Sequence, residues 1–122
     1  MATRDINHLI KRVVGRCGMS RPGEDVDEDA AVTIREQWEE LHAKLVGLQV
    51  AYYTPDAIPL QVFADVVDYV ALHIAPEFGV MPVLLNAIGA NDPEAAKDTA
   101  LRKMRDHVAK DFDEERMQVI PY

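Results

Sequence analysis

Residues 68–80, "DYVALHIAPEFGV", are central to the fold because they start as a buried helix and then stop abruptly. The helix that they close begins near residue 60, and its apolar residues occupy more than half of its circumference. These residues are Val62, Phe63, Val66, Val67, Tyr69, Val70 and Ile74. A helix that is apolar on several sides has to be covered on several sides. We therefore predict that residues 60–75 form the central helix of a bundle.

Two residues predict where this helix ends. The ring of Pro76 would clash with the carbonyl four residues earlier if the helix continued. Gly79 permits the backbone to reverse because it lacks a Cβ. We expect the chain to turn a corner here, with Phe78 folding back onto the core.

Three more segments carry the helical period. Residues 5–17 have a continuous apolar stripe, with Thr3 as a candidate cap and Gly18 as a candidate left-handed stop. Residues 28–46 carry apolar residues at spacings of three and four, namely Ile34, Trp38, Leu41, Leu45 and Leu48. Residues 93–112 follow a strong start signal, in which Asp92 is the cap and Pro93 the first helical residue.

The pattern between and after these helices completes the predicted architecture. Residues 82–88 read as a short helix, with Pro59 at the first position of the central helix. The last residues, "MQVIPY", leave the helical pattern and read as an extended tail. We predict an all-α fold: a single-domain bundle of four main helices plus a short helix over residues 1–116, with an extended C-terminal tail at 117–122.

Composition excludes several classes of protein. The chain has 122 residues, one cysteine and a net charge of −8, from 21 acidic and 13 basic side chains. This charge argues against a sequence-independent grip on DNA phosphates, which needs clustered Lys and Arg. A single cysteine excludes an internal disulfide and suits a reducing compartment. The chain lacks the ~20 consecutive apolar residues of a membrane span, and its first residues do not resemble a signal peptide.

Residues with catalytic potential are few and scattered. Glu39 and His42 form a single E-x-x-H pair, whereas di-iron bundles need two such pairs plus two further glutamates. Cys17 falls on an apolar stripe and reads as a core residue. His73 is expected to be partly buried with one hydrogen bond. We therefore predict no enzyme activity, no metal and no cofactor.

Two features suggest contact with a partner. Arg4, Lys11, Arg12 and Arg16 would give the first helix a basic outer strip, suited to an acidic protein surface or to another copy of the chain. An ordinary solvated face explains this strip as well. Val119, Ile120 and Tyr122 make the end of the chain apolar, so it either packs on its own domain or docks on a partner.

Three stretches resemble one family in their order along the chain. "INHLIKRVVGRCGMSRPGED" (6–25) is similar to an opening helix that ends in a Gly-containing turn. "IREQWEELHAKLVGLQVAYY" (34–53) resembles the second helix, with an aromatic residue midway and an exit that starts with Gly. "IPLQVFADVVDYVALHIAPEFGV" (58–80) resembles an apolar helix that closes on an A-P-E-aromatic-G corner. Together they resemble the head–tail adaptors of tailed bacteriophages, above all the tail accessory or packaged-DNA stabilisation proteins of short-tailed phages.

The resemblance implies a structural virion protein at the head–tail interface, made in the host cytoplasm. Such adaptors form a ring beneath the portal protein, commonly twelve-fold, in contact with neighbouring copies and with tail or nozzle proteins. The ring extends the channel through which DNA passes and helps to retain packaged DNA. By this analogy, the docking residues on the portal or a neighbouring subunit are Gln118, Val119, Ile120, Pro121 and Tyr122.

Two alternatives stay open at this point. A small cytoplasmic interaction or regulatory domain would use the first helix or the Tyr52–Tyr53 loop as its binding face. A metal-dependent bundle enzyme would carry bound metal when purified.

Overall fold

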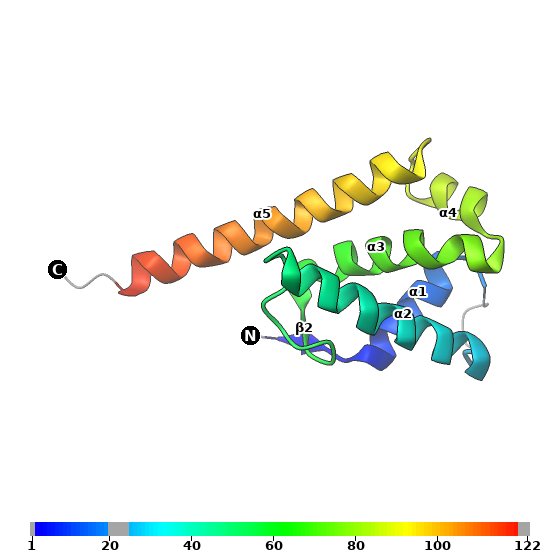
Figure 1. Ribbon diagram of the computed structural model, residues 1–122, viewed down its shortest axis with the longest axis horizontal. Coiled ribbons are helices and arrows are strands. Elements are labelled where there is room, and N and C mark those ends of the chain that lie inside the picture. Colours follow the sequence, from blue (N-terminus) through cyan, green and yellow to red (C-terminus); the bar gives the residue numbers. More distant parts are fainter. Residues whose placement is uncertain (1, 20–24, 120–122) are drawn as a thin grey trace.

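The core of the protein is organised around α3, Leu60–Phe78. The computed structural model describes the backbone of residues 2–19 and 25–119, and the side chains within these ranges as far as residue 108. Ten residues of α3 are buried, and α1, α2, α4 and α5 all pack against it. Figure 1 shows α3 in the middle of the molecule with the other helices around it. The prediction of a central helix is confirmed.

The end of α3 differs from the prediction. Pro76 lies inside the helix, which continues to Phe78 and ends at Gly79, whose φ of 69° is left-handed. A proline in the last turn removes a single backbone hydrogen bond, and the turn is closed without it: Val80 N–H donates to the Ala75 carbonyl at 3.1 Å. The corner is therefore set by glycine rather than by proline. Phe78 does pack against the core, as predicted.

The first two long helices are α1, Ile6–Arg16, and α2, Glu28–Gly47. Their apolar stripes face the core, and Gly18 adopts the left-handed conformation expected after α1. Two details of the prediction are wrong. The cap of α1 is Asp5, not Thr3, and Leu48 lies beyond the end of α2 with 42% of its surface exposed.

A short antiparallel pair of strands, which the sequence did not predict, explains why Thr3 cannot be the cap. Strand β1, Thr3–Arg4, pairs with β2, Ile58–Pro59, in the register Thr3↔Pro59 and Arg4↔Ile58. Pro59 is accordingly the residue before α3 rather than its first residue. The pair ties the start of the chain to the start of the central helix.

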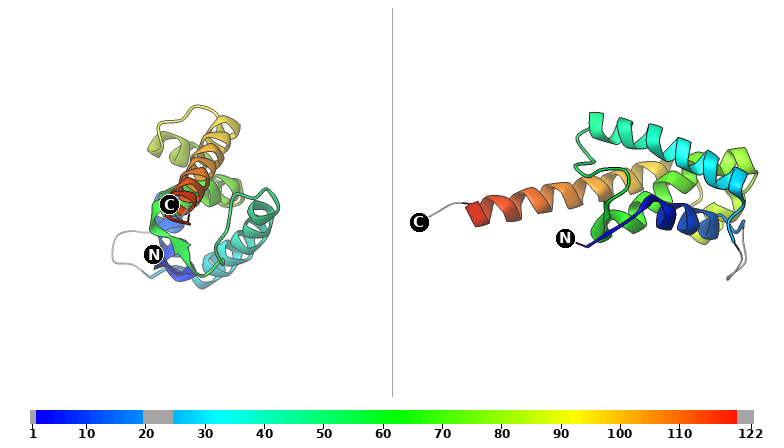
Figure 2. Two further views of the ribbon diagram at one scale, coloured as in Figure 1. Left: turned by 90° about the vertical axis from the view of Figure 1, so that its left-hand side faces the viewer. Right: turned by 90° about the horizontal axis from the view of Figure 1, so that it is seen from below.

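The chain then forms α4, Met81–Ala87, and α5, Pro93–Val119. Asp92 caps α5 as predicted, since its Oδ1 accepts the Glu94 N–H at 3.0 Å. The first half of α5 packs on α3 through Ala100, Met104 and Val108. Its second half extends past the other helices toward the C-terminus (Figures 1 and 2). At ~1.5 Å per residue, the 27 residues of α5 span about 40 Å.

The predicted end of the last helix is therefore wrong. Residues 113–119 are helical, so Met117, Gln118 and Val119 do not belong to an extended tail, and the boundary after residue 116 falls within α5. The apolar stripe in the sequence ends before the helix does. The helix can continue beyond it because Lys, Glu, Arg, Met and Gln have high intrinsic helix propensity, which does not depend on burial. Ile120, Pro121 and Tyr122 lie outside the described residues. The fold class is all-α, as predicted.

Candidate interaction surface

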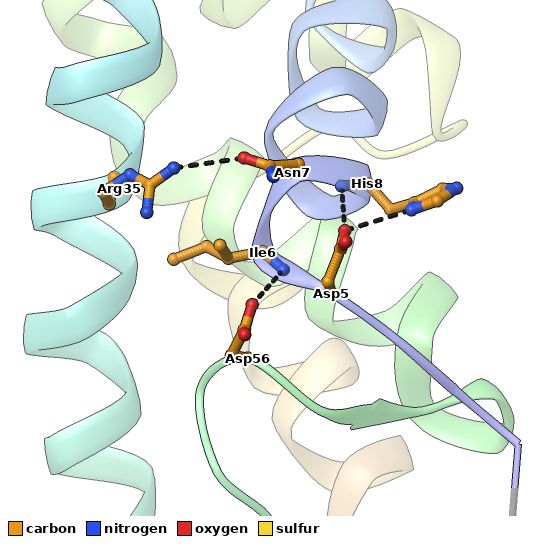
Figure 3. Close-up of polar contacts among 6 residues, drawn as sticks. All are labelled: Asp5, Ile6, Asn7, His8, Arg35 and Asp56. Atoms are coloured by element: carbon orange, nitrogen blue, oxygen red, sulfur yellow. Dashed lines mark hydrogen bonds and ion pairs between the residues drawn. The ribbon is translucent and has the colours of Figure 1, made fainter.

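The start of α1 is fixed by two carboxylates from different segments (Figure 3). Asp5 Oδ1 accepts the His8 N–H at 2.9 Å, and this hydrogen bond holds the pKa of Asp5 below its usual value. Asp56 Oδ1 accepts the Ile6 N–H at 3.1 Å across 50 residues of sequence. Free N–H groups at a helix start need such acceptors. The connection between α2 and β2 is thereby held to α1.

We expect Asp56→Ala to lower the free energy of unfolding by about 1 kcal/mol, because Ile6 N–H loses its acceptor. Asp56→Asn keeps an oxygen in the same place and should retain more than half of this stability. Urea denaturation of both variants measures the difference. Equal losses in the two variants would mean that the Asp56 hydrogen bond does not stabilise the helix start.

The connection between α2 and β2 also contacts α2 through two ring nitrogens, one of Trp38 and one of His42. Trp38 Nε1–H donates to the Pro55 carbonyl at 2.9 Å, and His42 Nε2 lies 2.6 Å from the Tyr53 carbonyl. A carbonyl can only accept, so His42 carries its hydrogen on Nε2. The His42 ring also contacts the rings of Trp38 and Tyr53. His42 therefore has a structural role, and its partner in the E-x-x-H pair, Glu39, points to solvent.

The two tyrosines of the predicted Tyr52–Tyr53 binding loop differ in exposure. Tyr53 is partly buried, and burial raises the pKa of its hydroxyl well above the usual value. Tyr52 is 45% exposed and packs edge-on against the Tyr53 ring at 5.4 Å. Val46 and Leu48 are also more than 40% exposed. The C-terminal end of α2 thus presents apolar side chains to solvent.

The predicted basic strip on α1 is divided by the fold. Arg4 lies on β1 instead of α1, with its guanidinium 5.3 Å from the centre of the Phe63 ring. Arg16 forms an ion pair with Asp68 of α3, with Nε and Oδ1 2.9 Å apart. Lys11 and Arg12 are exposed and form no ion pair with any side chain that the structure describes. Of the four residues, only Lys11 and Arg12 remain an unpaired cationic surface.

A groove of about 380 Å³ runs between α3 and the start of α5. The carboxylates of Asp65, Asp68 and Asp92 line it together with Lys103. Each carboxylate already has a structural partner: Asp68 pairs with Arg16, Asp65 lies 3.4 Å from Nε2 of His107, and Asp92 caps α5. Burial raises the pKa of Asp65. The carboxylates therefore tie α1 and α5 to α3.

Metal ligands and a reactive thiol were sought among the described residues. In residues 2–19 and 25–108, no group of three or more His, Cys, Asp or Glu side chains is placed to hold a metal ion. Cys17 is 1% exposed, as its apolar position predicted, and burial raises its pKa to about 11. A thiol with this pKa stays protonated at neutral pH. No described helix is long and apolar enough to cross a membrane.

His73 contradicts one prediction. It is partly buried, as expected, but its Nε2 is buried without a hydrogen-bond partner among the described residues. Its ring packs edge-on against Tyr69 at 4.6 Å. Burial lowers the pKa of His73 to about 4, helped by Lys97 of α5 and Lys44 of α2 and opposed by Glu94. The imidazole of His73 is therefore neutral at pH 7, on α3 and close to Lys44 of α2 and Lys97 of α5.

His73→Phe should raise the free energy of unfolding by about 1 kcal/mol at pH 7, because it keeps the aromatic contact and removes an unpartnered buried nitrogen. The difference between variant and wild type should grow as the pH falls from 6.5 to 4. In that window the unfolded chain binds a proton at His73 that the folded chain does not bind, which destabilises the wild type alone. Denaturation midpoints at several pH values measure this effect. His8→Gln is the control, since His8 is exposed. A gap that stays constant with pH would contradict the depressed pKa.

The predicted docking residues at the end of the chain are only partly described. The backbone of Gln118 and Val119 forms the last residues of α5, so their predicted extended conformation is wrong. This part of α5 leaves the bundle, as Figure 2 shows from two further directions. The sequence carries no apolar stripe over this part of α5, and its high helix propensity is the signal that could have predicted the helix.

Comparison with known proteins found no matching family model, no matching curated protein and no matching solved structure.

Proposed function

We propose that the chain is a structural head–tail adaptor of a tailed phage. It would bind the portal protein, form a ring with other copies of itself and extend the channel for packaged DNA. Tail or nozzle proteins would attach below. The protein would act in the virion, at the interface between head and tail, without a cofactor or a chemical step.

The observation that supports this proposal most is the projecting half of α5. The backbone of α5 leaves its own bundle and ends at Val119, away from the body (Figure 1). A binding element in that position can reach a partner while the bundle keeps its core intact. The resemblance of residues 6–80 to phage adaptors supplies the identity of the partner.

Charge gives additional support. A net charge of −8 repels DNA phosphates, and a channel wall has to let DNA slide without retaining it. The body is also well suited to a structural role, since α3 is covered by four helices and tied by Asp65 and Asp68 to α5 and α1.

Deletion of residues 117–122 tests the proposal. The portal protein encoded in the same genome is immobilised, and binding of the full chain is compared with binding of the deletion variant. A second variant, with the six residues replaced by Gly and Ser, controls for length. We expect the full chain to bind and both variants to bind at least about tenfold more weakly, because terminal aromatic and aliphatic anchors dominate such contacts.

The possible binding results distinguish the docking role of residues 117–122 from the adaptor function as a whole. Equal binding by the full chain and both variants would contradict the docking role of 117–122. A full chain that does not bind the portal would contradict the adaptor function itself. The exposed Val46, Leu48 and Tyr52 would then favour the alternative, a small cytoplasmic interaction or regulatory domain.

A further inference from the structure

Helix α5 is held to the bundle along its contact with α3, which we call the seam. As far as the structure describes it, α5 packs chiefly on α3. The described side chains of α5 that are buried there are Ala100, Met104 and Val108. The groove of about 380 Å³ lies along the seam and leaves part of it open to water. Helix α5 can therefore detach without breaking the packing of α1, α2 and α4 on α3.

Two histidines lie at the seam in opposite surroundings. Nε2 of His107, on α5, lies 3.4 Å from Oδ2 of Asp65 on α3, so a carboxylate faces this ring. Nε2 of His73, on α3, is buried and has no hydrogen-bond partner among the described residues. Protonation gives an imidazole an N–H on both ring nitrogens. A charged His107 therefore finds an acceptor, whereas a charged His73 would bury an unpaired N–H.

The groups around His73 also disfavour its charged form. Lys97 of α5 and Lys44 of α2 lie close to it, and its ring packs edge-on against Tyr69 of α3. Glu94 of α5 acts in the opposite direction, but its Oε1 already accepts from Lys97 Nζ at 3.2 Å and its side chain is exposed. Burial is the largest cause, and together with the two lysines it lowers the pKa of His73 to about 4. His73 is therefore held neutral by contacts that include α5.

We propose that protonation of His73 releases α5 from the bundle while α1–α4 remain folded. When α5 detaches, the ring gains access to water and the charge of Lys97 leaves with α5, so the open form binds the proton more tightly. The open form takes up this proton below about pH 6.5, whereas the closed form does so only near pH 4. Acid therefore favours the open form between these values. This switch does not depend on the adaptor function proposed above.

Asp65 contributes in the opposite direction. Burial raises its pKa, so as the pH falls the closed form takes up a proton at Asp65 before the open form does. The charged groups close to it are His107 and Lys103 of α5 and Asp68 of α3. Protonation of Asp65 thus stabilises the closed form in acid and weakens the effect of His73. Asp65→Asn removes this contribution and should make the opening of α5 depend more steeply on pH.

Amide hydrogen exchange of the whole chain, from pH 7 to about pH 4.5, tests the switch. The opening constant of an amide is its exchange rate divided by the rate of an unstructured chain at the same pH. We expect residues 100–108 of α5 to open more often at every pH than residues 9–14 of α1 and 66–70 of α3. Between pH 7 and about pH 4.5 the opening constant of residues 100–108 should rise about 10–50-fold, the upper value being the effect of His73 alone.

Two variants assign the effect to one histidine. His73→Phe keeps an aromatic ring against Tyr69 and cannot bind a proton, so the opening of its α5 should not rise in acid. His107→Gln loses the contact with Asp65 and should open more at every pH, with the rise in acid retained. Loss of that rise in His107→Gln would assign the switch to His107 and overturn the proposal.

Three further results would contradict the release of α5. The first is a rise of less than about threefold in the wild type. The second is an equal rise in His73→Phe. The third is exchange of residues 100–108 only together with residues 66–70, because α5 would then not detach on its own.

Discussion

Trp38→Ala should lower the free energy of unfolding by about 3–5 kcal/mol, the largest loss that we expect from any single substitution. Trp38 is 0% exposed, and its indole N–H holds the Pro55 carbonyl. Alanine leaves a cavity between α2 and the connection to β2, and it leaves that carbonyl without its donor. Because the same connection supplies Asp56 to the start of α1, hydrogen exchange should also speed up at Ile6.

Trp38→Phe separates the two contributions to this loss. Phenylalanine keeps most of the buried apolar volume and removes the indole donor, so about 1–3 kcal/mol of the loss should remain. Chemical denaturation of the two variants gives the comparison. A loss of less than about 1 kcal/mol for Trp38→Ala would mean that this residue is not the packing centre of α2.

Met104→Ala should lower the free energy of unfolding by about 2–5 kcal/mol. Met104 is 1% exposed and is one of the side chains that hold α5 on α3. Loss of this contact should loosen α5 before the rest of the bundle, because α1, α2 and α4 pack on α3 independently of α5. Hydrogen exchange should therefore increase first in residues 100–108.

Arg105→Ala is the matched control, one residue further along α5 and exposed. It should change the free energy of unfolding by less than about 0.5 kcal/mol. Portal binding by Met104→Ala should weaken together with the protection of α5, because the helix that carries residues 117–122 is no longer held at a fixed angle. Full binding with an unprotected α5 would show that the rigid projection is not needed.

The sequence predicted the elements whose burial repeats along a helix. The many apolar sides of α3 identified it as the central helix, and Asp92 with Pro93 identified the start of α5. Leu45 faces the core as its spacing indicated, whereas Leu48 does not, since α2 ends one residue before it. Helical periodicity predicts which residues are buried as long as the helix continues, and it no longer predicts burial beyond the end of the helix.

Features that depend on contacts distant in sequence were not predictable in the same way. The pair β1–β2 is two residues long on each side, which is too short to show alternation. Arg4 belongs to this pair and not to α1, so its contact with Phe63 depends on tertiary structure. The missing hydrogen bond of His73 likewise depends on how α2, α3 and α5 pack together.

The candidate partner-binding residues also differ in ways that depend on tertiary structure. Arg16 and Arg12 look equivalent in sequence, yet Asp68 of α3 engages Arg16 across 52 positions and leaves Arg12 exposed. The second half of α5 was not predicted, for a different reason. Its helix depends on the propensity of charged residues rather than on burial, and an apolar pattern does not report propensity.

The native mass of the portal complex tests the central claim most directly. The chain is mixed in excess with the assembled portal ring, and the mass of the complex is compared with that of the ring alone. The adaptor account predicts a gain of one 13.7 kDa chain for each portal subunit. A complex with the mass of the bare ring, at concentrations where the chain is folded, would contradict it.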